Sequence, residues 1–113
     1  MANNMTLEQS FRALAEREPG KFIAPYQGAI ICVREDGKYR RAAEFTQDDA
    51  DAILAALGYW WFCQPFGVDE WEMQVWRRGA TRYIQAGYHL SSKHACAVAA
   101  TIAAISHYLE THK

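Results

Sequence analysis

The sequence lacks the features that mark several classes of protein. Its 113 residues include only three cysteines, and no two of them form a Cys-x-x-Cys pair, which excludes a zinc ribbon or a thioredoxin-like redox motif. It has no glycine-rich motif of the kind that cradles phosphate. Twelve basic residues stand against 13 acidic ones, for a net charge of -1, so no overall field draws the chain to nucleic acid or membrane.

Long hydrophobic runs are also missing. The longest, residues 95–105, is interrupted by Thr101 and is about half as long as a membrane span. Residues 1–6 carry neither the basic region nor the apolar core of a signal peptide. Cys32, Cys63 and Cys96 each lie in an apolar run, where a free thiol behaves as a small hydrophobe. We therefore expect a soluble cytoplasmic protein with reduced cysteines.

Half of the residues are hydrophobic and 22% are charged, which is typical of one globular domain over residues 1–113. Three segments have the apolar period of a helix. The first follows Thr6 and ends before Pro19-Gly20, the second follows Thr46 and ends at Gly58, and the third runs over residues 93–112. Hydroxyl N-caps and a glycine C-cap agree with these limits.

The segments between the helices predict antiparallel strands. Asp36-Gly37 separates residues 29–33 from a half-polar return strand, and a two-residue loop there pairs Cys32 with Arg41. Residues 59–63 form an apolar strand that ends at the segment 64–67, and residues 71–76 return as residues 81–88. A loop at Arg78-Gly79 pairs Met73 with Ile84.

These elements predict an α+β fold in a single domain. An antiparallel sheet of about five strands, made of two hairpins plus one strand, packs with three helices in the order α-β-β-α-β-β-β-α.

No residue constellation predicts an enzyme, a metal site or a cofactor. His107 and Glu110 share a helix face, but His112 lies five residues after His107 and points elsewhere. Cys63 lies in an aromatic run, where a buried thiol is inert. Ser92 precedes a helix, where serine acts as a cap.

Strand alternation places Trp76 and Tyr83 on the polar side of the second hairpin, away from the core. Tryptophan, tyrosine and arginine are the residues enriched at interface hot spots. Arginines lie beside both hairpin turns, those of the first at the edge of the sheet. The predicted partner-binding residues are Trp76, Arg77, Arg78, Arg82, Tyr83, Arg40 and Arg41.

Residues 46–110 combine a capped acidic helix, a tryptophan-containing hairpin and an alanine-rich last helix that contains Cys96. This arrangement resembles that of small phage and prophage proteins of unknown function that form an α/β sandwich. The resemblance implies an origin in a mobile element and carries no catalytic residues with it.

We therefore expect a non-enzymatic module that binds a bacterial protein or protein complex, and neither nucleic acid nor membrane. If the phage resemblance holds, the concrete form is an inhibitor of a host defence complex that covers the target's surface, as an anti-CRISPR protein does. The alternative is a domain that binds a small molecule or nucleotide in an aromatic pocket at Trp60 and Phe62. A homodimer through the small residues Cys96, Ala100 and Ala103 of the last helix is also open.

Overall fold

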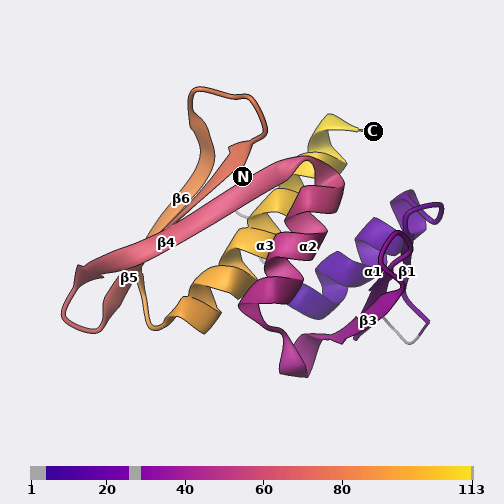
Figure 1. Ribbon diagram of the computed structural model, residues 1–113, viewed down its shortest axis with the longest axis horizontal. Coiled ribbons are helices and arrows are strands. Elements are labelled where there is room, and N and C mark those ends of the chain that lie inside the picture. The colour runs from indigo at the N-terminus through magenta and orange to yellow at the C-terminus, as the bar shows by residue number, and fades with distance from the viewer. Residues whose placement is uncertain (1–4, 26–28, 113) are drawn as a thin grey trace.

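The computed structural model of the chain describes residues 5–25 and 29–112. It confirms the α+β class, the three helices and the order of the hairpins, and it adds one short strand after the first helix (Figure 1). In chain order the elements are α1 (Leu7–Arg17), β1 (Phe22–Ile23), β2 (Ile30–Val33), β3 (Lys38–Arg41), the 3-10 turn η1 (Ala42–Glu44), α2 (Gln47–Leu57), β4 (Tyr59–Gly67), β5 (Glu70–Arg77), β6 (Tyr83–Leu90) and α3 (Lys93–Thr111).

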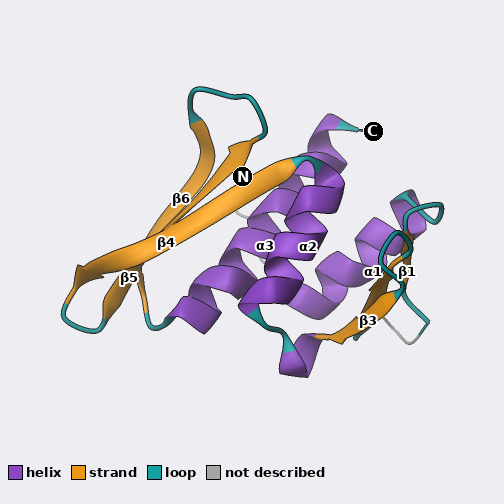
Figure 2. Cartoon of the chain, in the orientation of Figure 1, coloured by secondary structure: helices purple, strands orange, loops and turns teal. Residues whose placement is uncertain are grey.

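The strands form two antiparallel sheets of three strands, where we expected one sheet of about five. The first sheet has the order β1-β2-β3 and the second the order β4-β5-β6. Figure 2 shows them at opposite ends of the molecule, with the helices between them. Hairpin signals predict which consecutive strands pair, but nothing in the sequence predicts whether the edges of two hairpins meet. Here η1 and α2 intervene, and each hairpin packs against helices instead.

The helix limits follow the expected caps. Thr6 and Thr46 each form a capping box with the residue three positions later, and the Ser92 hydroxyl accepts a hydrogen bond from the Ala95 amide at 3.0 Å. Gly58 closes α2 at φ 89°, a conformation that favours glycine. These starts and stops are confirmed because each one depends on residues within a single turn.

Helix α3 is the centre of the core and packs against α1, α2 and the second sheet. Its residues Cys96, Ala100 and Ala104 are fully buried. Cys96 and Ala100 are therefore unavailable to a second copy of the chain, and of the predicted dimer stripe only Ala103 is partly exposed. The wide apolar arc of this helix is explained by neighbours on several sides within one chain. Burial also raises the pKa of the Cys96 thiol to about 11, which keeps it protonated and unreactive.

The register of the first hairpin differs from the prediction by two residues. Cys32 pairs with Tyr39, not with Arg41, and residues 34–37 form a four-residue turn in which only Gly37 has a positive φ. The carboxylate of Asp36 explains the shift. It accepts a hydrogen bond from the Lys38 amide at 2.8 Å, and this side chain-to-backbone bond stabilises a turn other than the two-residue type.

The second hairpin also differs from the predicted register. Met73 pairs with Gly87 and Trp76 with Tyr83, because residues 78–82 form a longer loop and β6 contains two irregularities. Strand β4 does not end at Pro65 but continues to Gly67. Proline is compatible with this position because β4 is an edge strand.

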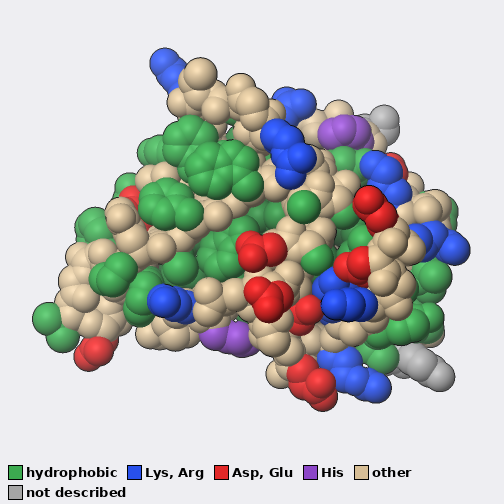
Figure 3. All heavy atoms as spheres, viewed as in Figure 1, with side chains coloured by type: hydrophobic (Ala, Val, Ile, Leu, Met, Phe, Trp, Pro, Cys, Tyr) green, Lys and Arg blue, Asp and Glu red, His purple; other side chains and the backbone are tan. Residues whose placement is uncertain are grey.

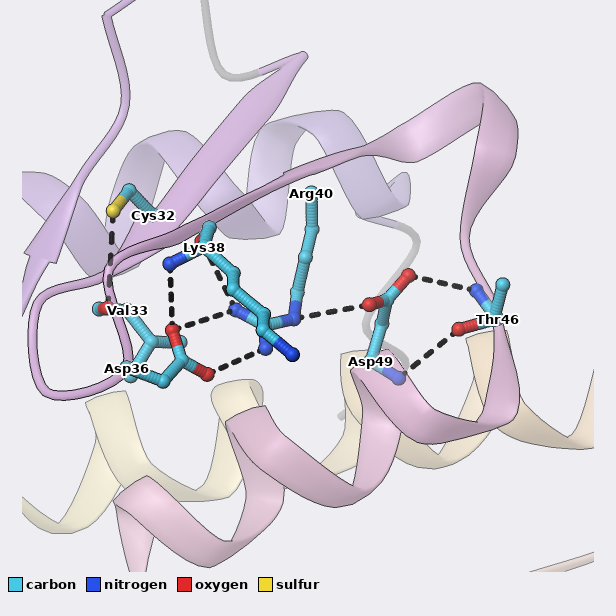
Figure 4. A network of polar contacts seen from close by, with 7 residues as sticks. All are labelled: Cys32, Val33, Asp36, Lys38, Arg40, Thr46 and Asp49. Carbon is cyan, nitrogen blue, oxygen red and sulfur yellow. Dashed lines mark hydrogen bonds and ion pairs between the residues drawn. The ribbon is translucent and has the colours of Figure 1, made fainter.

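Arg40 connects the first hairpin to α2 (Figure 4). Its side chain is only 5% exposed, and it forms ion pairs with Asp36 and, through Nε at 3.1 Å, with Asp49. Asp49 also accepts a hydrogen bond from the Thr46 amide at 3.0 Å. Arg40 lies in an edge strand, as predicted, but its side chain is buried instead of exposed, because the guanidinium holds β3 against the start of α2.

This ion pair predicts a pH dependence of folding. The guanidinium of Arg40 lowers the pKa of Asp36 below its ordinary value. A carboxyl group whose folded pKa is lowered stabilises the fold above its unfolded pKa of about 4, and that contribution is lost as pH falls through the folded value. Asp36→Asn should lower the free energy of unfolding by about 1 kcal/mol at pH 7 and leave it unchanged near pH 2.

Urea denaturation at a series of pH values measures this difference. Glu35→Gln is the matched control, since Glu35 is an exposed acid in the same turn. Stability curves for Asp36→Asn and the unsubstituted protein that stay parallel from pH 7 to pH 2 would contradict the assignment.

Candidate functional site: the outer face of the second sheet

The second sheet has one face against the helices and one face toward solvent. Alternation along β4 and β5 turns Tyr59, Met73 and Val75 into the core. The residues between them point the other way. Figure 3 shows hydrophobic side chains gathered over β4 and beside it. We call the outward aromatic residues of this sheet the aromatic face: Trp60, Phe62, Phe66, Trp76, Tyr83 and Tyr88.

One row of the aromatic face crosses all three strands. Trp60 pairs with Trp76, which pairs with Tyr83. The two indole rings stack with centroids 5.2 Å apart and planes at 9°, and Tyr83 meets Trp76 edge-on at 6.1 Å. These contacts hold three large rings in fixed positions while Trp60 and Tyr83 stay 44% and 49% exposed.

A second aromatic group lies at the far end of the sheet. Phe66 and Tyr88 have ring centroids 4.9 Å apart and are 47% and 45% exposed. His89 lies edge-on to Phe66 at 5.6 Å, and its Nδ1 is 2.9 Å from a carboxylate oxygen of Glu70. This end of the face therefore combines exposed aromatic area with an acidic group.

A polar strip separates the two aromatic groups. Glu72 is only 7% exposed, and its carboxylate accepts hydrogen bonds from Gln64 at 2.6 Å and Gln74 at 3.3 Å. The charge of Glu72 also raises the pKa of the Tyr88 hydroxyl. Gln74 in turn accepts a hydrogen bond from the Trp76 indole at 3.3 Å. The polar side chains of the strip therefore find hydrogen-bond partners within the protein, and Gln74 orients the Trp76 indole.

The structure brings only some of the predicted arginines to this face. Arg78 and Arg82 are exposed in the loop that joins β5 to β6, next to the Trp60 row. Arg77 is exposed at the end of β5, where its charge acts on Tyr59 and His107 on the helix side of the sheet. Arg40 and Arg41 lie in the first sheet, at the other end of the molecule.

Trp60 and Phe62, the residues of the predicted aromatic pocket, lie outside the two hollows described next. Two hollows in the described part of the molecule have volumes of about 540 and 390 Å³, and neither residue lines either of them. Both side chains lie on the open sheet face instead. A flat face suits a large partner, whereas small molecules bind in concave sites.

Phe66 and Tyr88 were not among the predicted site residues. The reading of residues 64–67 as a strand break hid Phe66, although Trp60, Phe62 and Phe66 all keep the period of two. Tyr88 could not be found by alternation, because the irregularity between Val75 and Trp76 adds one residue to β6 after Tyr83 and changes the side to which the following β6 residues point.

Among residues 5–25 and 29–112, no group of three or more histidine, cysteine or acidic side chains is arranged to hold a metal ion. None of the described helices is long and apolar enough to cross a membrane. No protein-family model, no curated protein and no solved structure matches the chain.

Proposed function

We propose that the protein is a non-enzymatic protein-binding module and that the aromatic face is its binding surface. The main evidence is where the exposed apolar side chains lie. Six large hydrophobic residues are exposed in the described part of the chain, and five of them belong to the second sheet and its turns: Trp60, Phe66, Val68, Tyr83 and Tyr88.

The energetics of such a face favour a protein partner. Each exposed aromatic ring loses contact with water on binding, at about 25 cal/mol per Å² of apolar surface. The rings are already ordered by stacking, so less side-chain entropy is lost than for mobile residues. Arg78 and Arg82 lie at one end of the face, and an arginine forms bidentate contacts with a carboxylate. The face therefore fits a protein surface with an apolar centre and acidic residues at one side.

Single-stranded nucleic acid also stacks on aromatic rings, but the charge pattern favours a protein. A strand of nucleic acid needs basic residues along its whole path. Here the described basic residues beside the face lie around the loop between β5 and β6, while Asp69 and Glu70 lie at the other end and Glu72 lies between the two aromatic groups. The resemblance to phage proteins extends the proposal to a bacterial target, such as a defence complex that the protein inhibits by covering its surface.

Affinity capture from a nuclease-treated bacterial lysate tests the proposal. The unsubstituted protein should retain one partner protein in a stoichiometric complex. Trp60→Ala combined with Arg78→Glu should lose that partner, while Tyr39→Ala, which removes an exposed ring from the first sheet, should keep it. A partner that survives changes on the aromatic face, or one that disappears on nuclease treatment, would contradict the proposal.

A further inference from the structure

A groove of about 540 Å³ lies between β6 and α3, on the side of the sheet opposite the aromatic face. This volume is within the range of sites that bind small molecules. Apolar residues are the larger part of its lining, which also includes Met5, Met73 and the polar Gln85 of β6. Strand β6 contributes Ile84, Gly87 and Leu90, and α3 contributes Ala99, Ile102 and Ala103.

One end of the groove is polar. Ser106, His107 and Glu110 follow the apolar residues along α3 and share their face of the helix. Glu110 is exposed at this end, and none of the ion pairs found among the described residues includes it. The groove is therefore amphipathic along its length.

The Ser106 hydroxyl is the unusual feature of the polar end. Ser106 is only 8% exposed, and its Oγ atom is buried without a hydrogen-bond partner among the described residues. Thr101 and Thr111 of the same helix both donate to the carbonyl four residues earlier, at 2.8 and 2.9 Å. This unpaired hydroxyl lies beneath the polar end and has essentially no exposed surface, so Glu110 is the group at this end that a ligand can reach.

His107 does not repel a positively charged ligand at this end of the groove. Its Nδ1 atom lies 2.7 Å from the Tyr59 hydroxyl. Burial is the main cause that lowers its pKa, so the imidazole is neutral at pH 7. Arg77, whose charge also lowers that pKa, does not line the groove. Glu110 is thus the only charged side chain among the described residues that line the groove.

We propose that this groove binds a small amphipathic amine. The apolar body lies between β6 and Ala99–Ala103, and the ammonium group pairs with the Glu110 carboxylate. A fatty carboxylate fits less well, because Glu110 repels it. The site is separate from the aromatic face, so the proposal does not depend on the proposed protein partner.

Titration of octylamine, 1-octanol and octanoate into the isotope-labelled protein tests the proposal by NMR. Octylamine should shift the amide signals of Gly87, Ala99 and Ala103 and leave the indole signals of Trp60 and Trp76 in place. Glu110→Gln should weaken octylamine binding at least about fivefold and leave 1-octanol binding unchanged. Glu44→Gln, an exposed acid in η1, is the matched control and should change neither.

A variant that narrows the groove provides a second test of the proposal. A Cβ atom at Gly87 would lie 3.6 Å from Met73 Cε and 3.7 Å from Leu90 Cδ1, which are ordinary contacts. Gly87→Val adds this Cβ and two methyl groups to the groove wall, and this variant should lose both octylamine and 1-octanol. Octanoate binding as tight as octylamine, equal octylamine affinity in Glu110→Gln, or signal changes confined to the aromatic face would each overturn the proposal. Glu110 is exposed, so the titration of Glu110→Gln tests the proposal even if Gly87→Val does not fold.

Discussion

Replacing Ala100 with glutamate is expected to abolish folding. Ala100 has no exposed surface and lies on α3, which packs against both other helices and the second sheet. A carboxylate at this position is an unpaired charge in an apolar interior, which costs several kcal/mol. Overpacking adds about 1–3 kcal/mol. Because a domain is stable by only about 5–15 kcal/mol, the variant should lose its cooperative thermal transition in circular dichroism.

Ala103→Glu is the matched control for this prediction. Ala103 is on the same helix, three residues later, but it is partly exposed at the groove. A carboxylate there reaches water, so this variant should keep a cooperative transition. If Ala100→Glu instead melts like the unsubstituted protein and sediments as a smaller species, the buried stripe of α3 is a dimer interface and the packing described above is wrong.

Trp60→Ala combined with Arg78→Glu is expected to weaken partner binding by at least about 2 kcal/mol, or roughly thirtyfold. Trp60 is the exposed end of the stacked row, and its removal takes away a large apolar contact without uncovering the core. Arg78→Glu reverses the charge that faces the acidic side of the partner. Trp60 is preferred to Trp76, which lies between two rings and whose removal would disturb the whole row.

Isothermal titration of the captured partner, beside a thermal melt of each variant, measures this effect. Loss of the stacking between Trp60 and Trp76 should lower the free energy of unfolding by only about 0.5–1.5 kcal/mol. Tyr39→Ala with Arg41→Glu makes the same kinds of change on the first sheet and should leave the affinity unaltered. Equal losses of affinity in both double variants would mean that the aromatic face is not the specific contact surface.

Local signals in the sequence predicted the helices well. Thr6, Thr46, Ser92 and Gly58 act through hydrogen bonds within one turn of their own helix, so they can be recognised without knowledge of the rest of the chain. The outward position of Trp76 and Tyr83 is also confirmed, since Trp76 stacks on the exposed Trp60 and Tyr83 is itself exposed. Alternation of side chains within one strand is a local signal of the same kind.

Features that depend on contacts between distant segments were not predictable. Arg40 looked like an exposed arginine of an edge strand, and only its contact with Asp49 of α2 explains why it is buried. The separation into two sheets depends on how η1 and α2 are placed after β3. The position of Tyr88 depends on an irregularity in β6 that has no sequence signal.

Site-specific photocrosslinking tests the central claim most directly. A benzophenone amino acid at Tyr83 places the reactive group on the aromatic face, and the same residue at Tyr39, which is 63% exposed in the first sheet, is the control. In bacterial cells we expect Tyr83 to crosslink to one partner protein and Tyr39 to give no such product. Crosslinks to that partner from Tyr39 alone, or equally from both positions, would contradict a binding surface on the aromatic face.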